Sequence, residues 1–266
     1  MNGAQDLSFF SMVMCGILLL VPLLGIWYFK LGITKELLIS TLRMIVQLVL
    51  VGFFLEFVFH LNNWLLNSVW FMTMITVAVF SVIKNSDLKV RHFFCPVLLS
   101  FILANFFVVL YFNYFIVNLD FILDAKYMIA IGGMILGNSL RANIVGLGDF
   151  YKSIRKDEQL YFYKLSLGAT RFEALRDFAK RSFVSAMNPT IASMATMGIV
   201  SLPGMMTGQI LGGSVPLVAI KYQIAIMIAI LASTVLSISF SILFTVRYSF
   251  YKNGTLKKEI FRAPNP

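Results

Sequence analysis

The chain has 266 residues, of which 59% are hydrophobic and 13% charged, and its mean hydropathy is +0.85. A water-soluble domain of this length cannot bury so much apolar surface, so the composition excludes a soluble globular protein and indicates a membrane protein. The formal net charge of +10 does not indicate nucleic-acid binding, because the basic residues form no continuous patch interleaved with aromatic residues. Lys and Arg on cytoplasmic loops give multi-pass membrane proteins the same charge balance.

Apolar stretches of about 20 residues, the length of a bilayer-spanning helix, recur along the chain. Only helices and closed barrels satisfy the backbone in lipid, and the sequence lacks the alternating segments of a barrel, so it predicts an all-α membrane protein. We expect one transmembrane domain, 1–266, a polytopic bundle of about seven helices. Their predicted ranges are 7–29, 37–59, 64–83, 93–117, 127–147, 183–206 and 222–246. A charged, helical coupling region at 149–182 precedes the sixth helix, and we expect a mobile basic tail at 247–266.

Basic residues collect on one side of this predicted bundle. They lie at Lys30, Lys35, in the loop 84–92, in the coupling region and in the tail, whereas the opposite side has only Lys126 and Lys221. The positive-inside rule then predicts the N-terminus outside and the C-terminus in the cytoplasm.

The coupling region carries signals for two short helices joined at a tight turn. A helix over about 157–167 is predicted to end at Gly168, which favours a left-handed C-terminal cap. Thr170 stands three residues before Glu173, as in a capping box, and Ala174 begins an apolar stripe at helical spacing. The sequence therefore predicts a rigid knuckle that projects into water. An amphipathic helix lying on the membrane surface is the alternative.

The predicted sixth span is interrupted by the sequence SLPGMM. Pro203 lacks a backbone donor, and Gly204 permits backbone conformations that other residues resist. Broken helices in lipid occur where the freed backbone groups line a cavity or are covered by protein. This stretch is therefore a candidate gate or substrate site, with a simple kink or an outer helix end as the alternative. The candidate residues are Ser201, Leu202, Pro203, Gly204, Met205 and Met206, with Asn188 and Pro189 as a second irregular point.

Other polar residues within the spans are candidates for the transport pathway. Arg43 and Gln47 lie one turn apart on the second span, where ionisable groups usually face the bundle interior, although Arg43 could instead snorkel to the headgroups. Asn138 follows the GxxxG sequence of Gly133 and Gly137, which predicts a close helix–helix contact, either within the chain or across a dimer.

The sequence offers weak candidates for binding a metal ion. They are Glu56 near the outer end of the second span and the thioethers of Met205 and Met206. Thioethers favour soft ions such as Cu(I) over ferric ion, and adaptable packing is the alternative role of these methionines. The residues alone do not identify a metal.

No GxxxxGK[ST] sequence occurs, so the chain itself is not expected to bind ATP. The two histidines, His60 and His92, belong to no HExxH sequence or Ser-His-Asp set, and we expect a transport subunit rather than an enzyme.

The segment LSLGATRFEALRDF (165–178) is similar to the EAA-type cytoplasmic loop of ABC-transporter permeases, with Phe162 where that loop usually has Glu. More specifically, LSLGAT, NPT at 188–190, GIVSLPGMMTGQI (198–210) and AIKYQI (219–224) resemble the FetB-type permease family. The segments 43–59 and 132–140 also match its pattern, so the resemblance covers most of the chain. The family comprises membrane subunits of ABC transporters assigned to iron export, and plant relatives are implicated in aluminium tolerance.

The resemblance implies a multi-pass permease in a bacterial plasma (inner) membrane, working as a homodimer surrounded by lipid. A separate FetA-type ATPase subunit would hold ATP and Mg²⁺, and this chain would bind no cofactor. The residues implied to couple to that ATPase are Leu167, Gly168, Ala169, Thr170, Glu173 and Ala174. Three alternatives stay open: an ABC permease for a nucleotide sugar or another metal, a secondary transporter using Glu56 without an ATPase, and a receptor or scaffold.

Overall fold

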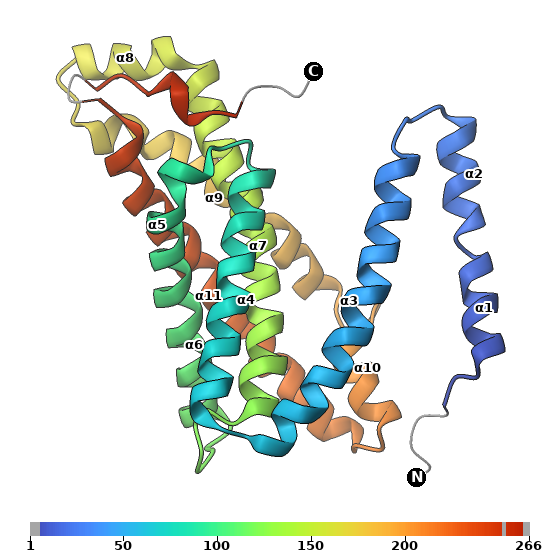
Figure 1. Cartoon of the computed structure of the whole chain (residues 1–266). Coiled ribbons are helices and arrows are strands. Elements are labelled where there is room, and N and C mark those ends of the chain that lie inside the picture. The colour runs from blue at the N-terminus through green and yellow to red at the C-terminus, as the bar shows by residue number, and fades with distance from the viewer. Residues whose placement is uncertain (1–5, 252–253, 263–266) are drawn as a thin grey trace.

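The structure, a computed structural model, describes residues 6–251 and 254–262, and every regular element in these residues is a helix (Figure 1). In chain order the elements are α1 (Phe9–Ile17), α2 (Leu20–Tyr28), α3 (Thr34–Leu61), α4 (Trp64–Asn85), α5 (Val90–Phe101), η1 (Ile102–Phe106), α6 (Phe107–Tyr111), η2 (Phe112–Ile116), α7 (Ala125–Lys156), α8 (Glu158–Ser166), α9 (Arg171–Thr196), α10 (Gly204–Leu211), α11 (Pro216–Ser249) and η3 (Lys258–Ile260). The predicted all-α membrane fold is confirmed.

Six helical segments of the described chain are long and apolar enough to cross a membrane. They are Phe9–Tyr28, Thr34–Leu61, Trp64–Asn85, Val90–Ile116, Ala125–Lys156 and Pro216–Ser249. The predicted sixth span, 183–206, is not among them. Its first part belongs to α9, its last residues belong to α10, and residues 197–203 between them are irregular. The prediction of one span over 183–206 was therefore wrong in its start, because α9 begins twelve residues earlier in the charged region.

The core lies where α4, α5, α7 and α11 pack together. Gly132 permits the close approach of α4 to α7, because a Cβ atom there would lie 2.7 Å from the Phe71 ring. At Gly133 a Cβ atom would lie 3.1 Å from the Met74 side chain, whereas at Gly137 it would meet nothing within 4 Å. The close contact predicted for the GxxxG sequence thus forms within the chain at Gly133. At Gly137 the space beside the helix is not filled by the described chain.

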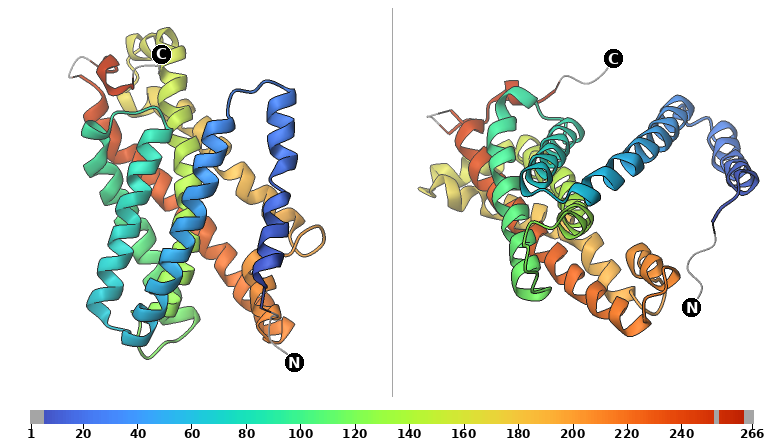
Figure 2. Two further views of the ribbon diagram at one scale, coloured as in Figure 1. Left: turned by 45° about the vertical axis from the view of Figure 1, so that its right-hand side comes forward. Right: turned by 60° about the horizontal axis from the view of Figure 1, so that its bottom comes forward.

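The first three helices form an arm that leans away from the core (Figures 1 and 2). The α1–α3 arm joins the core near the C-terminal end of α3, where Val58 is buried with Ala125 and Ile129 of α7. Towards the opposite end of α3, the arm and α4 diverge. Most apolar side chains of the arm are consequently exposed to lipid or to another protein.

One end of the molecule, here called the basic end, holds the α2–α3 and α4–α5 loops, α8 and the C-terminal segment (Figure 1). Residues 247–249 complete α11, and the segment 254–262 packs on this end with Leu256 and Ile260 buried. The Lys89 N–H donates to the Ile260 carbonyl (2.8 Å), and the Arg262 N–H donates to the Asp87 carbonyl (2.9 Å). Of the tail predicted at 247–266, residues 247–249 thus belong to α11 and 254–262 pack on the basic end; residues 252–253 and 263–266 lie outside the described chain.

Candidate coupling and gating site

The turn between α8 and α9 has the predicted knuckle geometry. Gly168 has φ +87°, its N–H donates to the Leu165 carbonyl (3.0 Å), and the Ala169 N–H donates to the Lys164 carbonyl (3.2 Å). These bonds close the last turn of α8 in the left-handed manner expected of a glycine cap. Leu167 is 69% exposed, and a Cβ atom on Gly168 would meet nothing within 4 Å. The tip of the knuckle is therefore free to contact another molecule.

The predicted capping box is present at the start of α9. The Thr170 hydroxyl accepts a bond from the Glu173 N–H (3.3 Å), and the Glu173 carboxylate accepts from the Thr170 N–H (2.7 Å). The Thr170 hydroxyl and N–H both stabilise the charged carboxylate and lower the pKa of Glu173 below its ordinary value. Stabilisation from this carboxylate is present at neutral pH and is lost as the pH falls through that lowered pKa.

The first turns of α9 are held against α8 and the end of α11. Ala174, Leu175 and Phe178 form the predicted apolar stripe and are buried. Lys164 of α8 forms an ion pair with Asp177, which lowers the pKa of that carboxyl. The knuckle and the first part of α9 therefore form one rigid unit.

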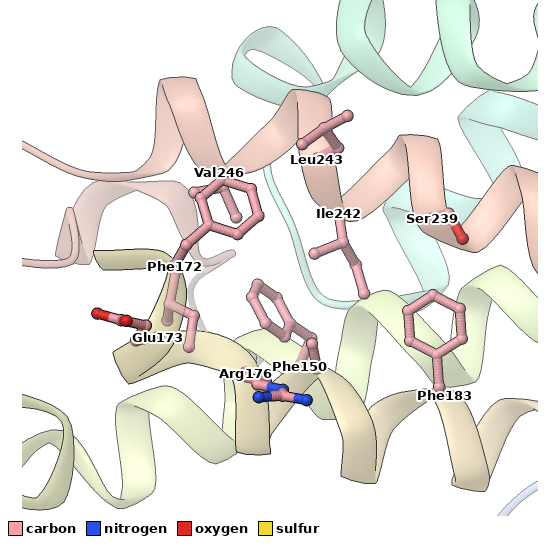
Figure 3. A pocket seen from close by; sticks show the side chains of 11 residues that line it. Phe150, Phe172, Glu173, Arg176, Phe183, Ser239, Ile242, Leu243 and Val246 are labelled. Atoms are coloured by element: carbon pink, nitrogen blue, oxygen red, sulfur yellow. The ribbon is translucent and has the colours of Figure 1, made fainter. Parts of the chain in front are cut away.

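An apolar groove of about 530 Å³ opens between α9 and α11 beside the knuckle (Figure 3). Phe172 stands at the knuckle end of the groove, and Phe150, Phe183 and Ile242 line it further along. Glu173 and Arg176 are the charged residues that line it. The exposed ring of Phe172, 67% accessible, gives this surface an apolar contact point next to a capped helix start.

From the knuckle, α9 continues without interruption to Thr196. Asn188 and Pro189, predicted as a second irregular point, lie inside the helix and are exposed, so that prediction was wrong. Proline removes one backbone N–H but leaves its carbonyl, which accepts a bond from the Ser193 hydroxyl (2.9 Å). The Ser182 hydroxyl ties the buried face of α9 to the Gly146 carbonyl of α7.

The helix break lies at residues 197–203, slightly before the predicted position. Gly198 has φ +87°, and its N–H donates to the Ser201 carbonyl (2.9 Å). Gly204, predicted to supply the unusual conformation, is instead the first residue of α10 after the N-cap Pro203 and is not in the left-handed region. The prediction of a break is confirmed, but Gly198 makes it. Ser201 and Leu202 are exposed, Met205 is half-buried and Met206 is buried.

Two glutamines not chosen from the sequence lie behind the break. Gln223 of α11 is buried, its Nε2 contacts the Met197 sulfur (3.8 Å), and its Oε1 has no hydrogen-bond partner. The Oε1 of Gln209 on α10 is also buried without a partner. Buried amides without partners are rare, and they mark the space between α10 and α11 as a place where a polar molecule or water would be stabilised. Gln223 could have been chosen from the sequence, because it belongs to the AIKYQI segment that resembles the permease family.

The remaining candidates do not gather at the break. Arg43 and Gln47 are exposed on α3, and Glu56 is exposed farther along the same helix. Asn138 of α7 is half-buried and donates to the Met134 carbonyl of its own helix (2.8 Å). Among the described residues, no three His, Cys, Asp or Glu side chains come together as a metal site. Glu56 belongs to the α1–α3 arm and Met205 and Met206 to α10, so the structure does not assemble them.

A buried polar ladder along α11 is the largest feature that sequence reasoning missed. Its members share α11 with a spacing of four residues: Ser233, Ser237, Ser241, Thr245 and Ser249. The Ser233 hydroxyl donates to Asn105 Oδ1 of η1 (3.0 Å), and Asn143 Nδ2 of α7 donates to Ser237 Oγ (2.8 Å). Further along, Ser241 bonds to Ser100 (2.7 Å). The regular spacing of hydroxyl residues in this apolar helix could have indicated the ladder from the sequence alone.

The chain is similar in sequence to several known proteins, some of which are named as membrane or permease proteins. The chain is 31% identical over 257 residues to the "UPF0014 membrane protein YjkA" of Bacillus subtilis, covering 93% of this chain and 100% of that protein. It is 31% identical to the "Probable iron export permease protein FetB" of Escherichia coli, with 84% of this chain and 85% of that protein covered. It is 32% identical to the "Protein ALUMINUM SENSITIVE 3" of Arabidopsis thaliana, with 79% and 76% covered. No solved structure matches significantly.

The family described as "Uncharacterised protein family (UPF0014)" matches residues 9–250, nearly the whole chain. The FetB-type resemblance of the sequence is confirmed by the Escherichia coli and Arabidopsis relatives. The chain therefore belongs to the UPF0014 family of membrane proteins.

Proposed function

We propose that the protein is the permease subunit of an ABC transporter in a bacterial plasma (inner) membrane, with its basic end in the cytoplasm. A separate ATPase subunit of the FetA type binds ATP and Mg²⁺ and docks on the knuckle at 167–174. The observation that carries this proposal is the continuity of α9, which links the exposed knuckle directly to the helix break. The resemblance to permease subunits supports the same role.

The continuity of α9 matters because a displacement at one end must reach the other. Its 26 residues span about 39 Å at a rise of 1.5 Å per residue. Closure of the ATPase on ATP shifts the knuckle, and the unbroken helix α9 carries this displacement to its far end. Met197 at its far end then moves against Gln223, so the break at 197–203 acts as the gate.

Two copies of the chain form the transporter in this proposal. Space is open beside the half-buried Gly137 of α7, since a Cβ atom there would meet nothing within 4 Å in the described chain. The nearby Arg141 side chain is exposed and bonds only weakly to the Gly137 carbonyl of its own helix (3.4 Å). A second copy facing this surface would enclose the pathway between the two subunits.

The proposed cargo is iron, moved out of the cell. The support is the resemblance to the Escherichia coli relative named as a probable iron export permease. The candidates Glu56, Met205 and Met206 lie on separate elements, so passage would rely on transient contacts near the break rather than on a fixed site.

The decisive experiment reconstitutes the chain with its ATPase in inverted vesicles and measures ATP-dependent uptake of ferrous iron. Gly168→Val is expected to reduce both coupled ATP hydrolysis and uptake at least tenfold, because a β-branched residue resists φ +87°. Gly32→Val is the matched control: Gly32 also has a positive φ (+71°) and open space around it, but it lies in the α2–α3 loop. The control is expected to transport at the wild-type rate.

Three results would contradict the proposal: equal loss in both variants, uptake without nucleotide or ATPase, or failure of any ATPase to bind the chain. Uptake of another metal or a nucleotide sugar in place of iron would overturn the cargo and leave the coupling intact.

A further inference from the structure

A cationic groove of about 800 Å³ lies at the basic end, between α3 and the α4–α5 corner. Of the eleven residues that line it, five are cationic and none is acidic. The cationic residues are Arg43, Lys84, Lys89, Arg91 and Arg262, and they come from α3, α4, the α4–α5 corner and the C-terminal segment. Val77, Phe80, Leu88 and Val90 supply an apolar wall.

The five cations of this groove form no ion pair within the described chain, although Lys89 and Arg262 also line a neighbouring pocket with Glu158 and Glu259. None of the five cations takes part in the three ion pairs found there, and Asp87, the acid in the same loop, is paired with Lys152 (2.7 Å). The start of α5 adds to the positive potential, because no side chain caps it and no acid lies in its first turn. Five like charges around one groove repel each other, so a bound anion would relieve a real electrostatic cost.

The position of the groove limits the nature of that anion. Arg43 lies within the apolar helix α3, whereas Lys84, Lys89 and Arg91 lie at the end of α4 and the start of α5. α3 and α4 diverge towards the basic end (Figures 1 and 2), and the groove residues Val77 and Phe80 are exposed on the apolar helix α4. A ligand that enters there must offer a negative group to the cations and hydrocarbon to Val77 and Phe80.

We propose that the groove is a binding site for the phosphate headgroup of an anionic phospholipid, with its acyl chains between α3 and α4. Basic pockets between helices at the membrane surface hold anionic headgroups by this chemistry. Free inorganic phosphate shares the charge but would leave the apolar wall uncovered. The site would brace the α1–α3 arm against the core at the end where the two make little contact.

The test uses the purified full chain in detergent, with native mass spectrometry to count retained lipid after adding phosphatidylglycerol or phosphatidylcholine. The double variant Arg43→Gln/Arg91→Gln is expected to bind phosphatidylglycerol about 25-fold more weakly, since each cation near a headgroup contributes roughly a fivefold factor. Its control, Lys156→Gln/Lys180→Gln, removes the same charge from two exposed residues outside the groove and is expected to bind as the wild type does.

Selective retention of phosphatidylglycerol that only the groove variant loses supports the site. Equal retention of the two lipids, equal loss in both double variants, or full competition by inorganic phosphate overturns it. A change of oligomeric state in the groove variant with unchanged lipid retention also overturns it, because it would assign the groove to a second copy of the chain.

Discussion

Asn143 and Ser237 are fully buried where α7 meets α11, and the Asn143 amide donates to the Ser237 hydroxyl (2.8 Å). Hydrogen bonds between membrane helices contribute roughly 0.6 kcal/mol on average and up to about 1.7 kcal/mol. We expect Ser237→Ala to lower the free energy of unfolding by about 1 kcal/mol, since Asn143 keeps only its bond to the Ser139 carbonyl. Reversible unfolding in mixed micelles measures this loss.

Ser239→Ala is the matched control, because the Ser239 hydroxyl bonds within its own helix to the Val235 carbonyl (2.7 Å) and is half-buried. Its effect is expected to be less than half as large. Equal losses for the two variants would show that the polar ladder does not hold α7 and α11 together.

At the scale of single residues, the sequence predicted local geometry well and tertiary contacts poorly. Gly168, Thr170 and Glu173 were predicted correctly, because caps depend on neighbours three or four positions away. The hydrogen-bond partner of Asn143 lies 94 positions away in the sequence, and no residue near Asn143 indicates it. Gly204 was predicted to permit the unusual backbone conformation of the break, yet the residue with a positive φ is Gly198.

The roles of Gly198 and Gly204 in the helix break can be compared directly by substituting each with alanine. We expect Gly198→Ala to destabilise the turn at 197–203 by about 1 kcal/mol, because an L side chain is strained at φ +87°. Gly204→Ala should leave the turn unchanged, since this position starts α10 in open space without a positive φ. Hydrogen exchange of the Gly198 and Val200 amides, which bond to the Ser201 and Thr196 carbonyls, reports the stability of the turn.

Faster exchange in the Gly198 variant alone would confirm that this residue makes the break. The opposite pattern, with the Gly204 variant loosened, would return the break to SLPGMM as the sequence predicted.

At the scale of elements, the length of the apolar stretches predicted where most membrane helices lie. The residues at which the helices begin and end were less predictable. Pro216 starts α11 as a first-turn proline, a position that needs no N–H donor. Pro189 was predicted to be part of an irregular point and instead lies inside α9. A proline can begin, interrupt or sit within a helix, and packing of the surrounding helices decides which occurs.

For the whole molecule, the distribution of Lys and Arg in the sequence predicted which loops lie at the same end. The angle between the α1–α3 arm and the core depends on packing and was not predicted. The loops and tail rich in Lys and Arg do lie together at the basic end (Figure 1). The divergence of the α1–α3 arm could not be predicted, because its apolar residues fit lipid or protein equally well. The docked segment 254–262 was also missed, since its two anchors, Leu256 and Ile260, stand among charged residues.

This docked segment connects several parts of the basic end. Ile260 is fully buried, its carbonyl accepts from the Lys89 N–H (2.8 Å), and the Tyr161 hydroxyl of α8 donates to the Gly254 carbonyl (3.0 Å). Ile260→Ala is expected to weaken docking by about 2 kcal/mol or more, which accelerates hydrogen exchange of the Lys89 amide roughly thirtyfold. Lys258→Ala, at an exposed neighbour, should leave exchange unchanged.

The consequence for coupling follows from the same contacts. Because the segment contacts α8 through Gly254 and Tyr161, its release should loosen the position of α8 and the knuckle relative to the core. In the proposed transporter, ATP hydrolysis by the ATPase subunit should then fall out of step with transport. Loss of coupling in Ile260→Ala with a normally folded core would show that the C-terminal segment sets the position of the knuckle. Faster exchange at Lys89 with intact coupling would show that the C-terminal segment is not needed to position the knuckle. The buried stripe of α9 at Ala174, Leu175 and Phe178 would then be what holds the knuckle in place.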